Sequence, residues 1–130
     1  MERPYDIIVW GASGFTGQLV VDYMSERQAN SNLRWAVAGR NINKLEQVLE
    51  GRNIPVLEAE SHDIASLNQL VQQGRVILTT VGPYARYGSE LVAACVRHGT
   101  HYCDLTGEVH WMREMISKHQ LEATNSGAKI

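Results

Sequence analysis

The chain has 130 residues, 44% of them hydrophobic, and a formal net charge of −2. This length predicts one domain with a packed core, and the charge gives no basic footprint for nucleic acid. No apolar run approaches the roughly 18 residues of a transmembrane helix, so we expect no membrane segment. The start is polar, unlike a signal peptide, and the two cysteines are too few to cross-link the domain; together they predict a cytoplasmic protein.

Short apolar runs alternate with amphipathic runs along the chain. We expect strands at 6–10, 34–38, 54–60, 75–81 and 101–104. We expect helices at 15–27, 42–50, from His62 or Asp63 to Gly74, at 89–98, and from Thr106 onward. This alternation predicts an α/β protein with a doubly wound parallel sheet of the Rossmann type, in three αβα layers. The expected strand order is 3-2-1-4-5, followed by a sixth strand that starts near Lys129.

Helical spacing predicts which side chains face the sheet. Cys95 and Cys103 are expected to be buried, the first in a helix and the second in a strand. The other inward positions, in chain order, are Leu19, Val20, Tyr23, Met24, Ile42, Leu45, Val48, Leu49, Ile64, Leu67, Leu70, Val71, Leu91, Val92, Val96, Val109, Met112, Met115 and Ile116.

Three glycines at a spacing of three separate the first strand from the first helix. Gly11 lets the chain turn off the strand, Gly14 lets the backbone approach a pyrophosphate, and Gly17 lets the helix pack on its strand. The free N–H groups of the first helical turn would then face an anion. The alternative is a purely structural turn. We predict a dinucleotide site that includes Gly11, Ser13, Gly14, Phe15, Thr16 and Gly17.

The end of the second strand indicates which dinucleotide is bound. An acidic residue there would accept the ribose hydroxyls of NAD. This chain has Arg40 instead, followed by Asn41 and Lys44, and a guanidinium can hold a 2′-phosphate. We therefore predict NADP rather than NAD, the alternative being a surface arginine. After the third strand, Asp63 is expected to contact adenine, to cap the next helix, or both.

The ends of the fourth and fifth strands should lie together at the switch point of the sheet. There we expect Val81, Gly82, Pro83 and Tyr84 to contact the cofactor, and Tyr84, Arg86 and Tyr87 to line the mouth; the alternative is a loop with exposed aromatics. Asp104 and Glu108 could orient the nicotinamide or transfer a proton, or merely cap the last helix. The candidate catalytic residues are Tyr84, Asp104 and Glu108. The histidine spacing fits no metal site, so no metal is expected.

Four motifs, at 5–17, 38–40, 81–84 and 101–108, resemble the N-terminal domain of saccharopine dehydrogenase-like oxidoreductases, which include trans-acting enoyl reductases. The resemblance implies an NAD(P)-binding Rossmann domain followed by a second domain that completes the substrate site and dimerises. Residues 1–130 would then be an N-terminal fragment that binds cofactor without turnover. The whole protein would transfer hydride between NADP(H) and a small-molecule carbonyl, imine or enoyl substrate. The alternative is a non-catalytic dinucleotide sensor or scaffold.

Overall fold

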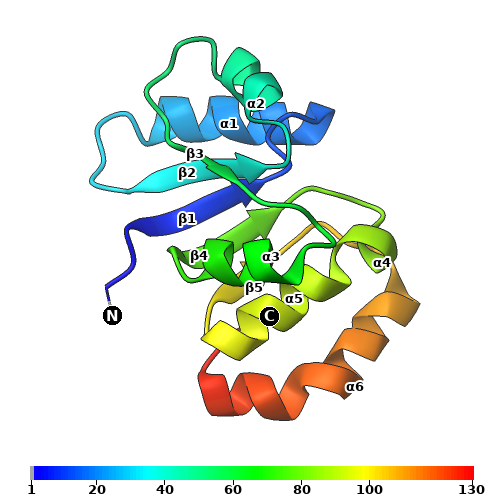
Figure 1. Cartoon of the computed structure of the whole chain (residues 1–130). Helices are drawn as coiled ribbons and strands as arrows, with labels where there is room; N and C mark the ends of the chain where they lie inside the picture. The colour runs from blue at the N-terminus through cyan, green and yellow to red at the C-terminus, as the bar shows by residue number, and fades with distance from the viewer. Residues whose placement is uncertain (1) are drawn as a thin grey trace.

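Residues 2–130 are described by a computed structural model, in which parallel strands alternate with helices (Figure 1). The strands are β1 (Tyr5–Trp10), β2 (Trp35–Gly39), β3 (Val56–Glu58), β4 (Gly74–Thr79) and β5 (His101–Cys103). The helices are α1 (Phe15–Arg27), α2 (Ile42–Leu49), α3 (Ile64–Val71), α4 (Tyr84–Tyr87), α5 (Ser89–His98) and α6 (Val109–Ser126). The sheet order is β3-β2-β1-β4-β5, and every pairing is parallel. The predicted Rossmann-type architecture is confirmed.

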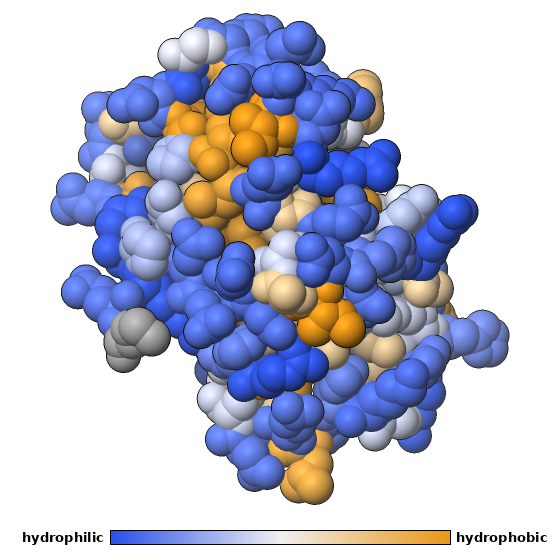
Figure 2. All heavy atoms as spheres, viewed as in Figure 1, coloured by the Kyte–Doolittle hydropathy of each residue, from blue (hydrophilic) through white to orange (hydrophobic). Residues whose placement is uncertain are grey.

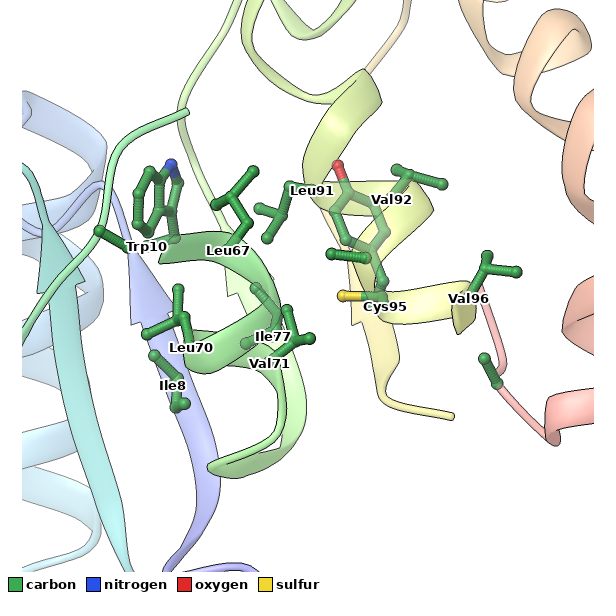
Figure 3. Close-up of a cluster of buried hydrophobic side chains, with 14 of the residues drawn as sticks. Ile8, Trp10, Leu67, Leu70, Val71, Ile77, Leu91, Val92, Cys95 and Val96 are labelled. Carbon is green, nitrogen blue, oxygen red and sulfur yellow. The ribbon is translucent and has the colours of Figure 1, made fainter. Parts of the chain in front are cut away.

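The two faces of the sheet carry separate hydrophobic cores. Successive residues of β1 point to opposite faces, so Val9 packs with α1 and α2, whereas Ile8 and Trp10 pack with α3 and α5. Figure 3 shows the second of these clusters, in which Leu67 and Leu91 face each other near Trp10. Helix α6 lies outside α5 and adds a further layer on that side (Figure 1).

The element bounds differ from the predicted ones in places with identifiable causes. Most strand ends shift by one or two residues, and β3 is short because it is an edge strand that pairs only with β2. On the view of Figure 2, hydrophobic side chains gather over β3 and α2, where Ile54 and Val56 are only partly buried. The short helix α4 was not predicted, and α6 begins at Val109 rather than at Thr106.

The predicted inward face of α1 is confirmed for Met24, and Val20 packs partly buried against the core, but the prediction is wrong for Leu19 and Tyr23. Leu19 is 55% exposed and Tyr23 is 58% exposed, while Gly17, Val21 and Met24 are buried. The helix carries apolar residues around most of its circumference, so spacing alone left its orientation open. The missing side chain at Gly17 decides it, because the helix approaches the sheet where no Cβ intervenes.

Several other core assignments are also corrected. On α6, Met115 is buried as predicted, but Val109, Met112 and Ile116 are exposed, and Trp111 and Ala123 face α5 instead. That helix packs mainly on another helix, so its buried stripe is narrow. At the start of α3, Ile64 is 54% exposed because it lies in the first turn.

Cys103 is exposed rather than buried, whereas Cys95 is buried as predicted. Alternation along β5 turns Cys103 away from buried Tyr102, at the edge of the sheet. At this edge the Tyr102 backbone N–H donates to the Lys129 carbonyl at 2.9 Å.

Within residues 2–130, no helix combines the length and apolar character needed to cross a membrane.

Candidate functional site

The glycine loop between β1 and α1 is built by two contacts that leave no room for a side chain. Gly11 has a φ of +98°, and a Cβ there would lie 2.7 Å from both Thr80 Oγ1 and Val81 Cγ2. A Cβ on Gly17 would lie 1.7 Å from the Gly11 carbonyl oxygen. The steric roles expected for Gly11 and Gly17 are confirmed. Val81, which follows β4, lies against Gly11 at the switch point of the sheet.

Gly14 is different, because nothing inside the protein demands a glycine there. An added Cβ would meet only the Gly11 carbonyl oxygen, at an ordinary 3.5 Å. Gly14 forms the N-cap of α1 without a side-chain cap, and Phe15 and Thr16 beside it are exposed. The first turn of α1 therefore presents its backbone N–H groups outward, with no acidic residue among them.

The end of β2 lies next to this loop. Trp10 is level with Ala38 in the parallel register, so Gly39 lies beside Gly11 and Arg40 follows directly. The Arg40 side chain is exposed, and within residues 2–130 it forms no ion pair. The backbone of β2 thus leads into Arg40 about one strand spacing, roughly 5 Å, from the end of β1, where the glycine loop begins.

The polar residues that follow β2 and β3 both cap helices. Asn41 Oδ1 accepts a hydrogen bond from the Lys44 backbone N–H at 3.1 Å, at the start of α2. Asp63 Oδ1 accepts from the Ser66 N–H at 3.2 Å, at the start of α3. The capping role of Asp63 is confirmed, and its contact with adenine stays a prediction.

The loops that follow β4 and β5 interlock through reciprocal hydrogen bonds. The Glu108 carboxylate accepts from the backbone N–H groups of Tyr84, at 2.7 Å, and Ala85, at 3.1 Å. In return, the Tyr84 hydroxyl accepts from the Leu105 N–H at 3.2 Å and donates to the Thr79 carbonyl at 3.2 Å. We call these five residues the β4–β5 clamp.

The sequence predicted that the Tyr84 ring would line the mouth of the site. That prediction is wrong, because the ring is buried. The Tyr84 side chain is 6% exposed and stacks on Trp111 with 5.8 Å between ring centroids. Burial raises the pKa of the Tyr84 phenol. Tyr87 is half-buried beside His62, and Arg86 lies over the Tyr87 ring at 5.4 Å. The rings of Tyr84 and Tyr87 thus pack against the protein, on Trp111 and beside His62, and do not form an exposed aromatic surface.

Asp104 is likewise engaged by its own loop. Its Oδ1 accepts from the Thr106 N–H at 2.9 Å, and its Oδ2 accepts from the Tyr102 hydroxyl at 2.6 Å. Burial and this hydrogen bond raise the pKa of the Tyr102 phenol. Beside these residues, Gly82 and Pro83 are exposed, and a Cβ on Gly82 would approach nothing closer than the Tyr84 ring at 3.6 Å. The open surface at this edge is therefore formed by Gly82 and Pro83.

Two residues that the sequence reasoning missed are Thr79 and Thr80, at the end of β4. Thr79 is buried, and its hydroxyl accepts from the Val81 N–H at 3.2 Å. The Thr80 hydroxyl donates to the Gly11 carbonyl at 3.4 Å. The available signal was a pair of hydroxyls that interrupts an otherwise apolar strand just before the loop. Elsewhere, within residues 2–130, no three His, Cys, Asp or Glu side chains gather to hold a metal ion.

A parallel sheet with this strand order, a glycine turn from β1 into α1 and an uncapped helix start at the switch point define a Rossmann-type dinucleotide-binding domain. The chain belongs to the saccharopine dehydrogenase NADP-binding domain family, whose model matches residues 7–130. The predicted family is therefore confirmed.

Two relatives resemble this chain in sequence, and one solved structure shares its fold. The chain is 41% identical over 134 residues to a trans-acting enoyl reductase of Mycobacterium leprae, covering 99% of this chain and 32% of that protein. It is 38% identical to a lipid droplet localized protein of Caenorhabditis elegans, covering 97% of this chain and 32% of that one. Saccharopine dehydrogenase (L-Glu forming) of Saccharomyces cerevisiae shares the fold, with a TM-score of 0.68, 16% identity, and coverage of 86% and 24%. The chain thus spans about a third of the length of these two relatives.

Proposed function

We propose that this chain binds NADP(H) and forms the cofactor-binding part of an oxidoreductase that moves hydride between NADP(H) and a carbonyl, imine or enoyl group. The observation that carries the proposal is the exposed Arg40 guanidinium, which has no ion-pair partner among residues 2–130, beside a glycine loop whose helix start has no side-chain cap. Family membership and the relatives named enoyl reductase support it. The exposed Cys103 thiol is consistent with the cytoplasmic setting that we propose.

In this proposal, different residues bind different parts of the cofactor. The N–H groups at Phe15 and Thr16 bind the pyrophosphate, which approaches the backbone at Gly14, while Arg40 with Lys44 binds the 2′-phosphate. The surface at Val81, Gly82 and Pro83 receives the nicotinamide half. The bound cofactor supplies the hydride chemistry, and the protein supplies binding and orientation. The small-molecule substrate and a homodimer contact would both belong to a further domain of a longer protein.

A cofactor titration with a charge-reversal variant tests the proposal. Arg40→Glu should raise the Kd for NADPH at least about tenfold and leave the Kd for NADH within about twofold, because only NADPH carries the 2′-phosphate. The matched control is Arg113→Glu on exposed α6, which makes the same change in net charge and should bind both cofactors normally. Equal small losses for NADPH and NADH would refute the role of Arg40.

Turnover is tested separately. We expect residues 1–130 to bind NADPH without oxidising it, since the chain spans only 32% of its Mycobacterium leprae relative. The assay follows nicotinamide absorbance with carbonyl, imine and enoyl compounds. Steady NADPH oxidation by residues 1–130 would show that the chain holds a complete active site. An absence of cofactor binding would reject the proposed function altogether.

A further inference from the structure

Glu108 occupies the N-cap position of α6 without a side-chain capping bond, and its carboxylate instead holds the β4–β5 clamp. Resting on the proposed function, we propose that Glu108 is a positioning residue, which holds the loop after β4 in the shape that receives the nicotinamide half of the dinucleotide. It acts through the backbone of Tyr84 and Ala85 and transfers no proton itself.

The bonding of the Glu108 carboxylate supports this assignment. Its Oε2 accepts from the Tyr84 N–H at 2.7 Å and its Oε1 from the Ala85 N–H at 3.1 Å, so each oxygen is held by a backbone group. The Thr106 hydroxyl lies 3.5 Å from Oε2 and adds a third donor. Hydrogen bonds to a carboxylate acceptor are roughly twice as strong as bonds between neutral groups. A carboxylate held in this way is suited to fixing a loop rather than to exchanging a proton.

Side-chain packing holds the loop after β4 in addition to the hydrogen bonds of Glu108. The Tyr84 ring is buried against Trp111, whose Nε1 donates to the Ser89 hydroxyl at 2.9 Å. At Gly88, a Cβ would lie 2.9 Å from the Tyr84 carbonyl oxygen and 3.0 Å from Trp111 Cζ2. Gly88 and Trp111 thus pack closely against Tyr84 on the inner side, so we expect the loop to move outward if the Glu108 bonds are lost.

The clamp lies on the nicotinamide side of the site. Arg40 follows β2, so the adenosine half with its 2′-phosphate belongs on the β2 side of the glycine loop. On the opposite side, Val81 contacts Gly11, and the exposed Gly82 and Pro83 lead directly into the clamp. The dinucleotide crosses the sheet at the switch point between its two halves. A change in the clamp should therefore affect only one half of the ligand.

Two ligands separate the halves experimentally. Adenosine 2′,5′-bisphosphate carries the adenosine phosphates without the nicotinamide, whereas NADPH carries both halves. Glu108→Gln keeps the side-chain volume but offers one acceptor oxygen and turns an NH₂ group toward the second backbone N–H. We expect the Kd for NADPH to rise about tenfold and the Kd for adenosine 2′,5′-bisphosphate to stay within about twofold. Glu122→Gln, on the exposed face of the same helix, is the control and should change neither value.

A second variant keeps the test decisive if Glu108→Gln does not fold, as judged by circular dichroism. Tyr84→Phe retains the buried ring and removes only the hydroxyl that joins Thr79 to Leu105, and it should give the same one-sided loss. Parallel weakening of both ligands, or no weakening of either, overturns the proposed role of Glu108. If the wild-type chain binds neither ligand, the proposed function fails and this inference fails with it.

Discussion

The substitution Gly17→Ala tests the contact that seats α1 on the glycine loop. The added Cβ would lie 1.7 Å from the Gly11 carbonyl oxygen and 2.8 Å from Ala12 Cα, well inside an ordinary contact of roughly 3.5 Å. Both partners are backbone atoms, so the whole helix must move away and disturb the packing of buried Val21 and Met24. Overpacking of this kind costs about 3 kcal/mol at the upper end of its usual range. Alanine returns about 1 kcal/mol through its helix propensity.

The expected net loss in the free energy of unfolding is therefore about 2 kcal/mol, which for a domain of this size lowers Tm by about 6–10 °C. Urea and thermal unfolding followed by circular dichroism measure it. The matched variant is Gly14→Ala, whose Cβ meets only the Gly11 carbonyl oxygen at 3.5 Å. It should cost less than about 1 kcal/mol as a helix N-cap change, yet weaken NADPH binding. A Gly17→Ala protein as stable as the wild type, or a Gly14→Ala protein equally destabilised, would refute the reasoning.

Two further predictions concern stability. The Arg3 guanidinium donates to the carbonyl of Gly74, the first residue of β4, at 2.6 Å and to that of His98, the last residue of α5, at 2.5 Å. Arg3→Ala should therefore lower the free energy of unfolding by about 2 kcal/mol; a urea midpoint equal to that of the wild type would contradict this. Burial raises the pKa of both Tyr84 and Tyr102 above the ordinary 10.0, so their contribution to stability is complete below pH 10 and is lost as pH rises beyond it. Tm measured from pH 8 to 11 should fall steeply at the alkaline end, and a flat profile, or phenolate absorbance from all tyrosines of the folded protein, would exclude the mechanism.

The alternation of strands and helices predicted a parallel sheet, because parallel strands require crossover connections. The order β3-β2-β1-β4-β5 was expected from the glycine turn after the first strand, which is typical of the Rossmann type. Orientation within an element was harder, as α1 shows. Its apolar residues surround the helix, but Gly17 marks the point of closest approach, and one and two turns later the same face carries Val21 and Met24. The buried face of α1 was therefore predictable from the position of Gly17 but not from the spacing of the hydrophobic residues.

The candidate site was predictable to a similar, partial extent. Gly11 and Gly17 have steric roles that follow from a strand–turn–helix motif, and Arg40 follows β2 as expected. The burial of Tyr84 and the bonds of Glu108 were not predictable, because they join segments 24 residues apart through backbone groups that carry no sequence signal. Such contacts depend on how two loops meet in space, which local patterns do not encode.

The unequal size of the two cores has a consequence for the way the domain opens. Between the sheet and helices α1 and α2 lies a small hydrophobic cluster around Val9, Val21 and Leu45. The hydrophobic cluster that α3, α5 and α6 form on the other face is much larger. Native-state opening should begin in the thinner layer, and amide protons of α1 and α2 should exchange with solvent before those of α5. The glycine loop leads into α1, and Arg40 lies just before α2. A ligand that binds there only when the layer is closed would slow its exchange by the factor 1 + L/Kd, where L is the free ligand concentration.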